Sequence, residues 1–428
     1  MPPLDDLSGD WKTRLAVIVD TMRDMSRHTD PQQMVRAYGE RIGPLFPHSR
    51  RLSLSRRGLE APNYRITRST TWTEEINPWK ERDRLPLFAG GLIAEWIYAG
   101  EPQIIDDLEV PCHEPAAEYL AGCRSVLAIP MFERGESINM VLIMREETGA
   151  FLKDEIADIV WRTNLFGRAT SNLVLSDELR QANRALDREM KVVGQIQRSL
   201  LPAKLPHIPG LDVAAYYQPA QRAGGDYYDF FPLPDGKWGI FIADVSGHGT
   251  PAAVFMAVTH CMAHTHPGPA NPPGRVLDYL NQHLVDHYTG ESGVFITAFY
   301  GVFSPAERTL NYASAGHNPP RLKHCQDGSL DSLDGVGGLP LGVRTGVRYA
   351  ETSRKLQRGD QLIFYTDGIT EAHNREDELF GLDRLDLSLK NCKQEAQSLL
   401  DEVLRAVESF TDGWPADDDR TLIVARVS

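Results

Sequence analysis

The stretch GGDYYDFFPLPDGKWGIFIADVSGHGTPAA (224–253) alternates apolar runs with turn residues, in a pattern that predicts two strands and a helix. DFFPLP (229–234) and KWGIFIADV (237–245) flank Asp235-Gly236, and an Asp-Gly pair between apolar runs is typical of a β-hairpin. Thr250-Pro251 fits a helix N-cap followed by the first helical residue. The stretch therefore predicts a hairpin that leads into a helix through the loop SGHG.

The same pattern of short strands between turn residues continues outward to the end of the chain, over about 203–428. Four further strands are expected from apolar runs, namely FITAFYGVF (295–303), TLNYASAG (309–316), QLIFYT (361–366) and RTLIVARV (420–427). Helical patterns are expected at 250–265, 274–288 and 394–410. The last two strands are almost wholly apolar, as buried strands are.

Acidic residues stand at the ends of these strands, in four separate places. They are Asp226 and Asp229 in GGDYYD, Asp244 in WGIFIAD, Asp367 in QLIFYTD, and Asp417, Asp418 and Asp419 before the last strand. One of them alone is typical of a turn or a solvated loop, but strand ends can meet at one edge of a sheet. Converging carboxylates repel one another, and a hard divalent cation relieves the repulsion. Without a matching cluster of His or Cys, the pattern favours Mg²⁺ or Mn²⁺ over Zn²⁺.

Residues from about Trp11 to Glu147 mix strand and helix patterns without a regular alternation, which predicts an α+β fold. Two alternating strands are expected in RLSLSRRG (51–58) and NYRITRSTTW (63–72), and a helix in LFAGGLIAEWIYAG (87–100). SVLAIPMFERGESINMVLIM (125–144) reads as two apolar strands joined by a turn at Glu133-Arg134-Gly135-Glu136.

A long helical stretch from about Leu152 to Leu201 separates the two regions and ends at Pro202, which cannot continue a helix. A seam that repeats every ~3.5 residues requires a partner helix, which favours a parallel coiled-coil dimer over 171–202. Gly167 and Gly194 weaken the repeat, and packing of the same stripe on the chain's own domains is the alternative. The repeat consists of Leu175, Leu179, Ala182, Leu186, Glu189, Val193, Ile196 and Leu200.

The chain has 428 residues, with 45 Lys and Arg against 59 Asp and Glu, so its formal net charge is −14. Such a charge argues against a general nucleic-acid or anionic-membrane binder, which would need a basic surface. No apolar run approaches the roughly 20 residues of a membrane helix, and MPPLDDLSGD lacks the features of a signal peptide. We expect a cytoplasmic protein whose scattered cysteines are reduced thiols. These are Cys112, Cys123, Cys261, Cys325 and Cys392.

Five phrases carry a family resemblance, and they are GGDYYDFF (224–231), ADVSGHGTPAA (243–253), ASAGHNPP (313–320), GDQLIFYTDGITEAHN (359–374) and DDRT (418–421). Their order and spacing resemble the PPM-type metal-dependent protein phosphatases, specifically the bacterial RsbU/SpoIIE class. The resemblance implies two packed β-sheets flanked by helices, an α-β-β-α sandwich, with two Mn²⁺ or Mg²⁺ ions at one end. It also implies hydrolysis of phosphoserine or phosphothreonine by a water that the metal ions activate.

The same resemblance implies roles for single residues. Asp244 would bridge both metals, and Val245 would offer its main-chain carbonyl to one of them. Asp367 and Asp418 would bind the other metal, and Asp226 would hold a metal directly or through water. The expected catalytic residues are Asp226, Asp244, Asp367 and Asp418. The expected metal ligands are Asp226, Asp244, Val245, Asp367, Asp418 and Asp419, of which Asp419, like Asp229, can instead be a supporting residue.

The chain departs from eukaryotic-type relatives, which carry a His two residues after the bridging Asp as a general acid. Here Ser246 holds that place and His248 lies four residues on, so we interpret SGHG as a tight loop rather than as the source of the acid. For Arg222 a surface role is favoured over a phosphate clamp. His317-Asn318 either line the site or form a turn fixed by the prolines that follow. Phe380-Gly381 and the preceding segment resemble the helical flap of the class.

Two phrases of the first region, GLIAEWIYAGEPQIIDDL (91–108) and RSVLAIPMFERGESINMVLIMREETGAFLKDEIADIV (124–160), resemble a GAF domain. The resemblance covers 12–170 and implies a six-stranded antiparallel sheet. It also implies a cupped pocket for a small ligand, or a degenerate pocket that serves only dimerisation. Three aromatic residues are either pocket residues or ordinary core, namely Trp72, Trp79 and Trp96.

Together these features predict a regulated phosphatase with a GAF-like sensor (12–170), a helical dimerisation linker (171–202) and a phosphatase domain (203–428). The substrate implied by the resemblance is a phosphoserine or phosphothreonine protein, specifically an anti-anti-sigma factor of the STAS fold. A non-catalytic regulator that binds a partner-switching protein is one alternative. A metal-dependent phosphodiesterase is another, although the acidic charge and the lack of a Gly-rich phosphate loop count against it.

Overall fold

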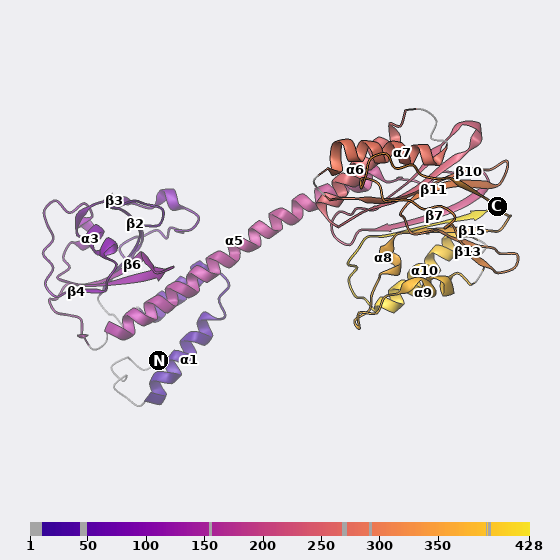
Figure 1. Ribbon diagram of the computed structural model, residues 1–428. Helices are drawn as coiled ribbons and strands as arrows, with labels where there is room; N and C mark the ends of the chain where they lie inside the picture. Colours follow the sequence, from indigo (N-terminus) through magenta and orange to yellow (C-terminus); the bar gives the residue numbers. More distant parts are fainter. Residues whose placement is uncertain are drawn as a thin grey trace. The chain divides into compact units, whose positions relative to one another are not determined.

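The computed structural model describes residues 11–42, 49–153, 156–267, 272–290, 293–390, 392 and 395–428 (Figure 1). The chain divides into two units, the first up to Asn183 and the second from Arg184 onward. Helix α5 (Ile156–Leu200) begins in the first unit and ends in the second. Within the described ranges, none of the helices combines the length and the hydropathy that a membrane span needs.

The first unit contains the expected six-stranded antiparallel sheet, in the order β3-β2-β1-β6-β5-β4. Its strands are β1 (Arg50–Ser55), β2 (Asn63–Ser69), β3 (Leu87–Ala89), β4 (Gln103–Ile105), β5 (Ser125–Glu133) and β6 (Glu136–Arg145). Its shorter helices are α1 (Trp11–Met25), α2 (Pro31–Ile42), α3 (Gly91–Ala99) and α4 (Ala117–Leu120). Trp96 belongs to the apolar core of this unit, whereas Trp79 is exposed.

The prediction of one helix over 87–100 is wrong at its beginning. Leu87–Ala89 form β3, which pairs with β2, and the helix α3 starts only at Gly91. Gly90 and Gly91 have φ angles of 76° and 80°, in the left-handed region that favours glycine. The two glycines therefore separate a strand from a helix, and the continuous apolar pattern around them conceals the break.

Two five-stranded antiparallel sheets form the second unit, in the orders β14-β11-β10-β9-β8 and β13-β12-β15-β16-β7. The first contains β8 (Tyr227–Pro232), β9 (Trp238–Val245), β10 (Ile296–Ser304), β11 (Thr309–Ala315) and β14 (Thr352–Lys355). The second contains β7 (Leu211–Gln218), β12 (Arg321–Lys323), β13 (Leu330–Ser332), β15 (Gln361–Tyr365) and β16 (Arg420–Val427). The hairpin β8/β9 and the strands β10, β11, β15 and β16 confirm the strands predicted from the apolar runs.

Helices cover the outer faces of these two sheets (Figure 1). α6 (Thr250–His264) and α7 (Pro273–Leu284) contact the first sheet, while α8 (Asp367–Thr370) and α10 (Ala396–Thr411) contact the second, and α9 (Gly381–Ser388) packs on α10. The sheets pack face to face, with the rings of Phe299 and Phe364 5.7 Å apart between their centroids. The second unit is thus the expected α-β-β-α sandwich, and α6, α7 and α10 confirm the three predicted helices.

The last turns of α5 pack on the second unit through one face of the helix. Gln197 is buried, and its Nε2 donates a 2.9 Å hydrogen bond to Tyr217 Oη on β7. A Cβ atom at Gly194 would lie 1.9 Å from the carbonyl oxygen of Arg222, so only glycine allows this approach. The helix ends at Leu200, before Pro202, as predicted.

Most of the predicted heptad seam is exposed in the single chain. Leu175, Leu179, Leu186 and Ile196 expose 65%, 60%, 56% and 60% of their surface. Val193 and Leu200, nearer the end of α5, are partly buried. Packing on the chain's own second unit therefore accounts for Val193 and Leu200 and leaves these four side chains, including Ile196 between them, in water.

The prediction that all five cysteines are reduced thiols is wrong for Cys325 and Cys392, which form a disulfide. Their Cα atoms are 5.8 Å apart, a normal distance for such a bond. The bond joins the segment after β12 to the segment after α9, and its two residues are 67 positions apart. Spacing along the chain therefore gave no sign of the pair, whereas Cys112, Cys123 and Cys261 are free, as expected.

The close approach at Gly194 predicts the effect of adding one methyl group. Alanine normally stabilises a helix by ~1 kcal/mol relative to glycine, but Gly194→Ala forces α5 away from the Arg222 carbonyl, at a cost of roughly 1–3 kcal/mol. We expect calorimetry to show a lower melting temperature for the second unit. Gly167→Ala, in the part of α5 that belongs to the first unit, is the control and should leave the melting temperature of the second unit unchanged, because its nearest contacts would be side-chain atoms of Met131. A Gly194→Ala chain as stable as the Gly167→Ala chain contradicts the close packing.

Candidate metal centre

Strand ends from both sheets bring acidic residues together in the second unit. Asp226 precedes β8 and Asp244 lies in β9 of one sheet, while Asp367 follows β15 and Asp418 precedes β16 of the other. The pKa of Asp244 is raised to about 8, first by burial and then by the negative charges of Asp367, Asp418 and Asp419. The predicted aspartates therefore converge at the interface between the sheets.

Asp226 is the most deeply buried of these carboxyl groups. Its Oδ2 accepts hydrogen bonds from Thr421 Oγ1 at 2.6 Å and from Thr366 Oγ1 at 2.8 Å. Its Oδ1 is buried and receives no hydrogen bond from the described residues. Burial and the charges of Asp244 and Asp419 hold the pKa of Asp226 well above its usual range. One fixed oxygen and one buried oxygen without a donor are what a cation ligand requires.

The remaining two carboxyl groups of the centre also resist ionisation. Burial, followed by the charge of Glu371, raises the pKa of Asp367. Burial also raises the pKa of Asp418, the charge of Asp367 adds to that effect, and His248 opposes it. Burial dominates both shifts, and the charges that add to it belong to other carboxyl groups. Ionisation of the whole cluster would thus gather negative charges that repel one another.

Asp419 differs from its neighbours because both of its carboxylate oxygens accept hydrogen bonds from backbone N–H groups. Oδ1 accepts a 2.8 Å hydrogen bond from Ala220 N, and Oδ2 accepts one from Gly225 N. A Cβ atom at Gly224 would lie 2.1 Å from Asp419 Oδ2. Position 224 must therefore be glycine for the loop before Asp226 to pack against this carboxylate. These contacts favour the supporting role for Asp419 that the sequence left open.

Val245 places its main-chain carbonyl beside the same loop. A Cβ atom at Gly225 would lie 2.9 Å from Val245 O, which puts this carbonyl next to the backbone that leads into Asp226. Val245 ends β9, directly after Asp244. The carbonyl predicted as a metal ligand is therefore close to the loop that leads into one of the predicted carboxylates.

Asp229, in contrast, lies outside this cluster. Its Oδ2 accepts a 2.8 Å hydrogen bond from Tyr227 Oη, and His264 Nε2 lies 2.7 Å from the same oxygen. Both histidines in its neighbourhood, His260 and His264, come from α6. Asp226 contacts threonines of the other sheet. The two aspartates of GGDYYD therefore lie on opposite faces of the sheet that contains β8.

The loop residues near the motifs have local partners. His248 is exposed, and its Nδ1 lies 3.0 Å from Gln221 Nε2, which agrees with the interpretation of SGHG as a loop. Arg222 is also largely exposed, and its Nε donates a 2.9 Å hydrogen bond to Asp187 Oδ1 on α5. The favoured surface role of Arg222 therefore agrees with the structure, and its partner is the helix that enters the second unit.

His317 is buried in the interior rather than placed on a surface turn. Its Nδ1 lies 2.9 Å from Thr297 Oγ1, and Thr297 is the β10 partner of Asp244 in β9. Burial lowers the pKa of His317 to about 4, so its imidazole is neutral at neutral pH. His317 therefore packs near the acidic cluster without contributing positive charge to it.

The segment expected to form a helical flap is helical only at its two ends, in α8 and α9. Between them, Asn374 Oδ1 accepts hydrogen bonds from Glu376 N at 3.1 Å and Glu378 N at 3.0 Å. A short polar side chain that binds nearby backbone N–H groups competes with a helix. The predicted helix is thus replaced by a turn around Asn374.

Thr366 and Thr421 are contributors to the centre that sequence reasoning missed. Each is adjacent to a motif that was recognised, since Thr366 precedes Asp367 in YTDG and Thr421 ends DDRT. Their hydroxyl groups fix Asp226, which lies more than 100 residues earlier in the chain. Their position beside the acids was visible in the sequence, but their shared partner was not.

Comparison with known proteins relates the second unit to one family. A family model described as Stage II sporulation protein E (SpoIIE) matches residues 234–428. Phosphoserine phosphatase RsbU of Bacillus subtilis is 30% identical over 248 residues, which cover 58% of this chain and 72% of RsbU. Phosphoserine phosphatase RsbP of Bacillus subtilis is 25% identical over 186 residues, 43% of this chain and 45% of RsbP.

A solved structure agrees with this relationship at the level of the fold. The SiaA-PP2C domain of Pseudomonas aeruginosa matches with a TM-score of 0.51 at 19% identity, covering 58% of this chain and 99% of that domain. At that identity the likeness concerns the sandwich of sheets and helices alone. The sequence relationship to RsbU and RsbP adds the activity, and on these grounds the chain belongs to the SpoIIE family of metal-dependent protein serine/threonine phosphatases.

Proposed function

We propose that the second unit holds two Mn²⁺ or Mg²⁺ ions and removes phosphate from a phosphoserine or phosphothreonine of a partner protein, under the control of the first unit. The observation that carries the metal assignment is Asp226 Oδ1, a buried carboxylate oxygen without a hydrogen-bond donor among the described residues. It lies in a group of acids whose pKa values are raised first by burial and then by one another's charges.

The donor set fits hard divalent cations. The proposed ligands are oxygen atoms of Asp226, Asp244, Asp367 and Asp418 and the main-chain carbonyl of Val245. Oxygen-only ligand sets suit Mg²⁺ and Mn²⁺ rather than softer metals. When bound, such ions polarise phosphoryl oxygens and lower the pKa of water, so that no protein nucleophile is needed.

The chain's own residues hold this centre in place. Thr366 and Thr421 orient the carboxylate of Asp226 from the second sheet, and Asp419 fastens the loop before it. Gly368 lets the turn after β15 pack against the backbone before the neighbouring strand β16, since a Cβ there would lie 2.0 Å from Asp419 O. We assign Asp419, Thr366 and Thr421 as positioning residues and the four other aspartates as the residues that act at the phosphoryl group through the metals.

The substrate is proposed from the relatives and from the chain's charge. RsbU and RsbP are both named phosphoserine phosphatases, and the sequence motifs resemble the class that acts on anti-anti-sigma factors of the STAS fold. The net charge of −14 disfavours a nucleic-acid substrate, which a phosphodiesterase would bind through basic residues. A phosphoprotein of a partner-switching pathway is therefore the substrate that we propose.

We propose that α5 carries the control. Its last turns contact the loop before Asp226 and the start of α6, which follows Asp244 and Val245. Asp187 pairs with Arg222, and the Arg222 backbone closes on Gly194, just before Gly224 and Asp226. Met190 Sδ accepts a 3.1 Å contact from Thr250 Oγ1, at the start of the helix that follows Asp244 and Val245. A shift of α5 therefore moves the supports of Asp226 and Asp244 together. We propose that a GAF-like first unit, with or without a small ligand, drives this shift.

The exposed seam of α5 provides the proposed dimer contact. Four leucine and isoleucine side chains at heptad spacing stay in water in the single chain, and a second copy of the helix would bury them. A parallel pair of α5 helices would carry the change in the first units to both phosphatase domains. The homodimer is thus part of the proposed mechanism of control.

Replacement of Asp244 tests the metal centre. Loss of its negative charge removes metal binding, and several kcal/mol of stabilisation by the metals correspond to at least a ~100-fold lower rate. We expect Asp244→Asn to show this loss in Mn²⁺-dependent hydrolysis of a phosphoserine protein. Asp235→Asn, in the hairpin turn, is the matched control and should retain the wild-type rate. Equal rates for Asp244→Asn and the wild type would refute the assignment, and undetectable turnover by the wild type with intact Mn²⁺ binding would support a non-catalytic regulator.

The raised pKa of Asp244 predicts how metal and pH affect stability. Without metal, its pKa of about 8 lies above the ~3.9 of an unfolded aspartate, so the folded state binds more protons between these values. The metal-free chain therefore loses stability as the pH rises through that window, and bound metal removes the penalty. We expect Mn²⁺ to raise the melting temperature more at about pH 8 than at about pH 6. A shift that is equal or smaller at the higher pH contradicts this assignment.

Introduction of charge on the seam tests the dimer. Leu179→Glu together with Leu186→Glu places charges at two exposed seam positions, which would repel across a parallel pair. We expect sedimentation to show half the wild-type mass. Arg184→Glu, on the outer side of the same helix, is the control and should retain the dimer. If the wild type and the double variant have the same mass, α5 is not the dimer contact.

A further inference from the structure

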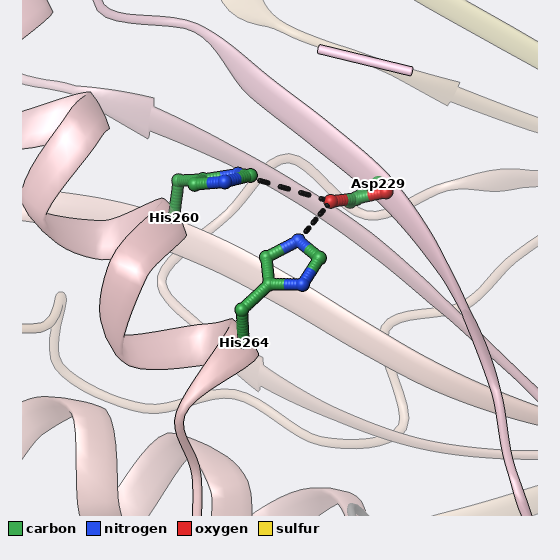
Figure 2. A group of neighbouring side chains, drawn as sticks. All are labelled: Asp229, His260 and His264. Carbon is green, nitrogen blue, oxygen red and sulfur yellow. Dashed lines mark hydrogen bonds and ion pairs between the residues drawn. The ribbon is translucent and has the colours of Figure 1, made fainter. Parts of the chain in front are cut away.

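In the second unit, three side chains on the outer face of the sheet that contains β8 form a compact group away from the acidic cluster. Asp229 comes from β8, and His260 and His264 come from successive turns of α6 (Figure 2). One ligand atom of each lies within 4.8 Å of the others. His264 Nε2 is 2.7 Å and His260 Nδ1 is 3.9 Å from Asp229 Oδ2. Figure 2 shows both imidazole rings directed at this one carboxylate.

The surroundings orient the carboxylate and leave one histidine atom without a partner. Tyr227 Oη donates to Asp229 Oδ2 at 2.8 Å, and Phe230 N donates to Asp229 Oδ1 at 2.7 Å. His260 Nδ1 is buried and has no hydrogen-bond partner among the described residues. Residues that fix a ligating carboxylate from behind are a regular part of metal sites. A buried imidazole nitrogen directed at the group is an independent sign that a further atom belongs there.

We propose that Asp229, His260 and His264 bind a divalent ion of the zinc class at a second metal site. Two histidines four residues apart on one helix face, joined by one carboxylate, are a donor set that suits Zn²⁺ and disfavours Mg²⁺. Three protein ligands leave a fourth position, and the exposed side of His264 opens it to solvent. Zinc bonds of about 2.0–2.1 Å require donor atoms about 3.3 Å apart. Relative to Asp229 Oδ2, His264 Nε2 would therefore move outward from 2.7 Å and His260 Nδ1 inward from 3.9 Å, each by roughly 0.6 Å.

The site is separate from the acidic cluster in position and in chemistry. Asp226 and Asp229 are three residues apart along the strand, which places their Cα atoms roughly 10 Å apart and their side chains on opposite faces. Asp226 contacts Thr366 and Thr421 of the second sheet, while Asp229 contacts α6. An ion at the second site would join β8 to α6, and α6 begins directly after the loop that follows Val245. The proposal therefore does not depend on the proposed function.

Zinc binding by the full chain, saturated with Mg²⁺ to occupy the acidic cluster, tests the proposal. We expect calorimetry to show one Zn²⁺ bound, and His264→Gln and His260→Gln each to weaken its affinity at least ~10-fold. With Co²⁺ as the probe, the wild type should show visible ligand-field bands that both variants lose. Circular dichroism of the variants checks that they fold, as the exposure of His264 leads us to expect.

Two controls decide where any bound zinc resides. His283→Gln removes a histidine from α7, and Asp244→Asn removes a carboxylate from the acidic cluster, and both should retain the wild-type zinc affinity. Zinc that is lost in His283→Gln or in Asp244→Asn but kept in His264→Gln binds elsewhere and overturns the proposal. Equal zinc affinities of the wild type, His260→Gln and His264→Gln would show that Asp229 and the histidines form only an ordinary hydrogen-bonded cluster.

Discussion

Repulsion among carboxyl groups from two different sheets is the constraint around which the second unit is built. Asp226 and Asp244 belong to one sheet, and Asp367 and Asp418 belong to the other, so the sandwich can close only where these charges meet. Glycine lets the backbone come close to these acids, at Gly224 against Asp419 Oδ2 and, within the second sheet, at Gly368 against Asp419 O. The fold thus brings together groups that destabilise it unless cations or protons neutralise them. The dependence of such a phosphatase on metal follows from this repulsion, because bound cations relieve it.

The sequence predicted those parts of this arrangement that depend on local pattern. Apolar runs with aspartate at one end, at the end of β9, after β15 and before β16, placed these strands and indicated that their acids would meet, because strand ends can share a sheet edge. The roles of the single aspartates, Asp244 above all, stay predictions. The supporting contacts could not be predicted, because Thr366 and Thr421 reach Asp226 across more than 100 residues, and no local pattern encodes such a distance.

The remaining surprises have the same physical origin. The Cys325–Cys392 bond and the Asp229, His260 and His264 group both depend on tertiary contacts between segments distant in the chain. The sequence indicated no histidine cluster to accompany the acids, since His260 and His264 lie in an otherwise apolar helix and Asp229 in a separate motif. The glycine pair at Gly90 and Gly91 shows the opposite limit, in which a local feature was present but the apolar pattern concealed it.

The contact of α5 with the Arg222 carbonyl restricts how this helix can transmit a signal. Successive side chains of a helix point about 100° apart around its axis, because a turn contains about 3.6 residues. A rotation by one residue in either direction would present Val193 or Gln195 to a carbonyl that has no room for a Cβ atom. A twist of α5 by one residue therefore requires this contact to break first. Under the proposed control through α5, the contact at Gly194 would thus separate two positions of the helix, one in contact with the Arg222 carbonyl and one released from it.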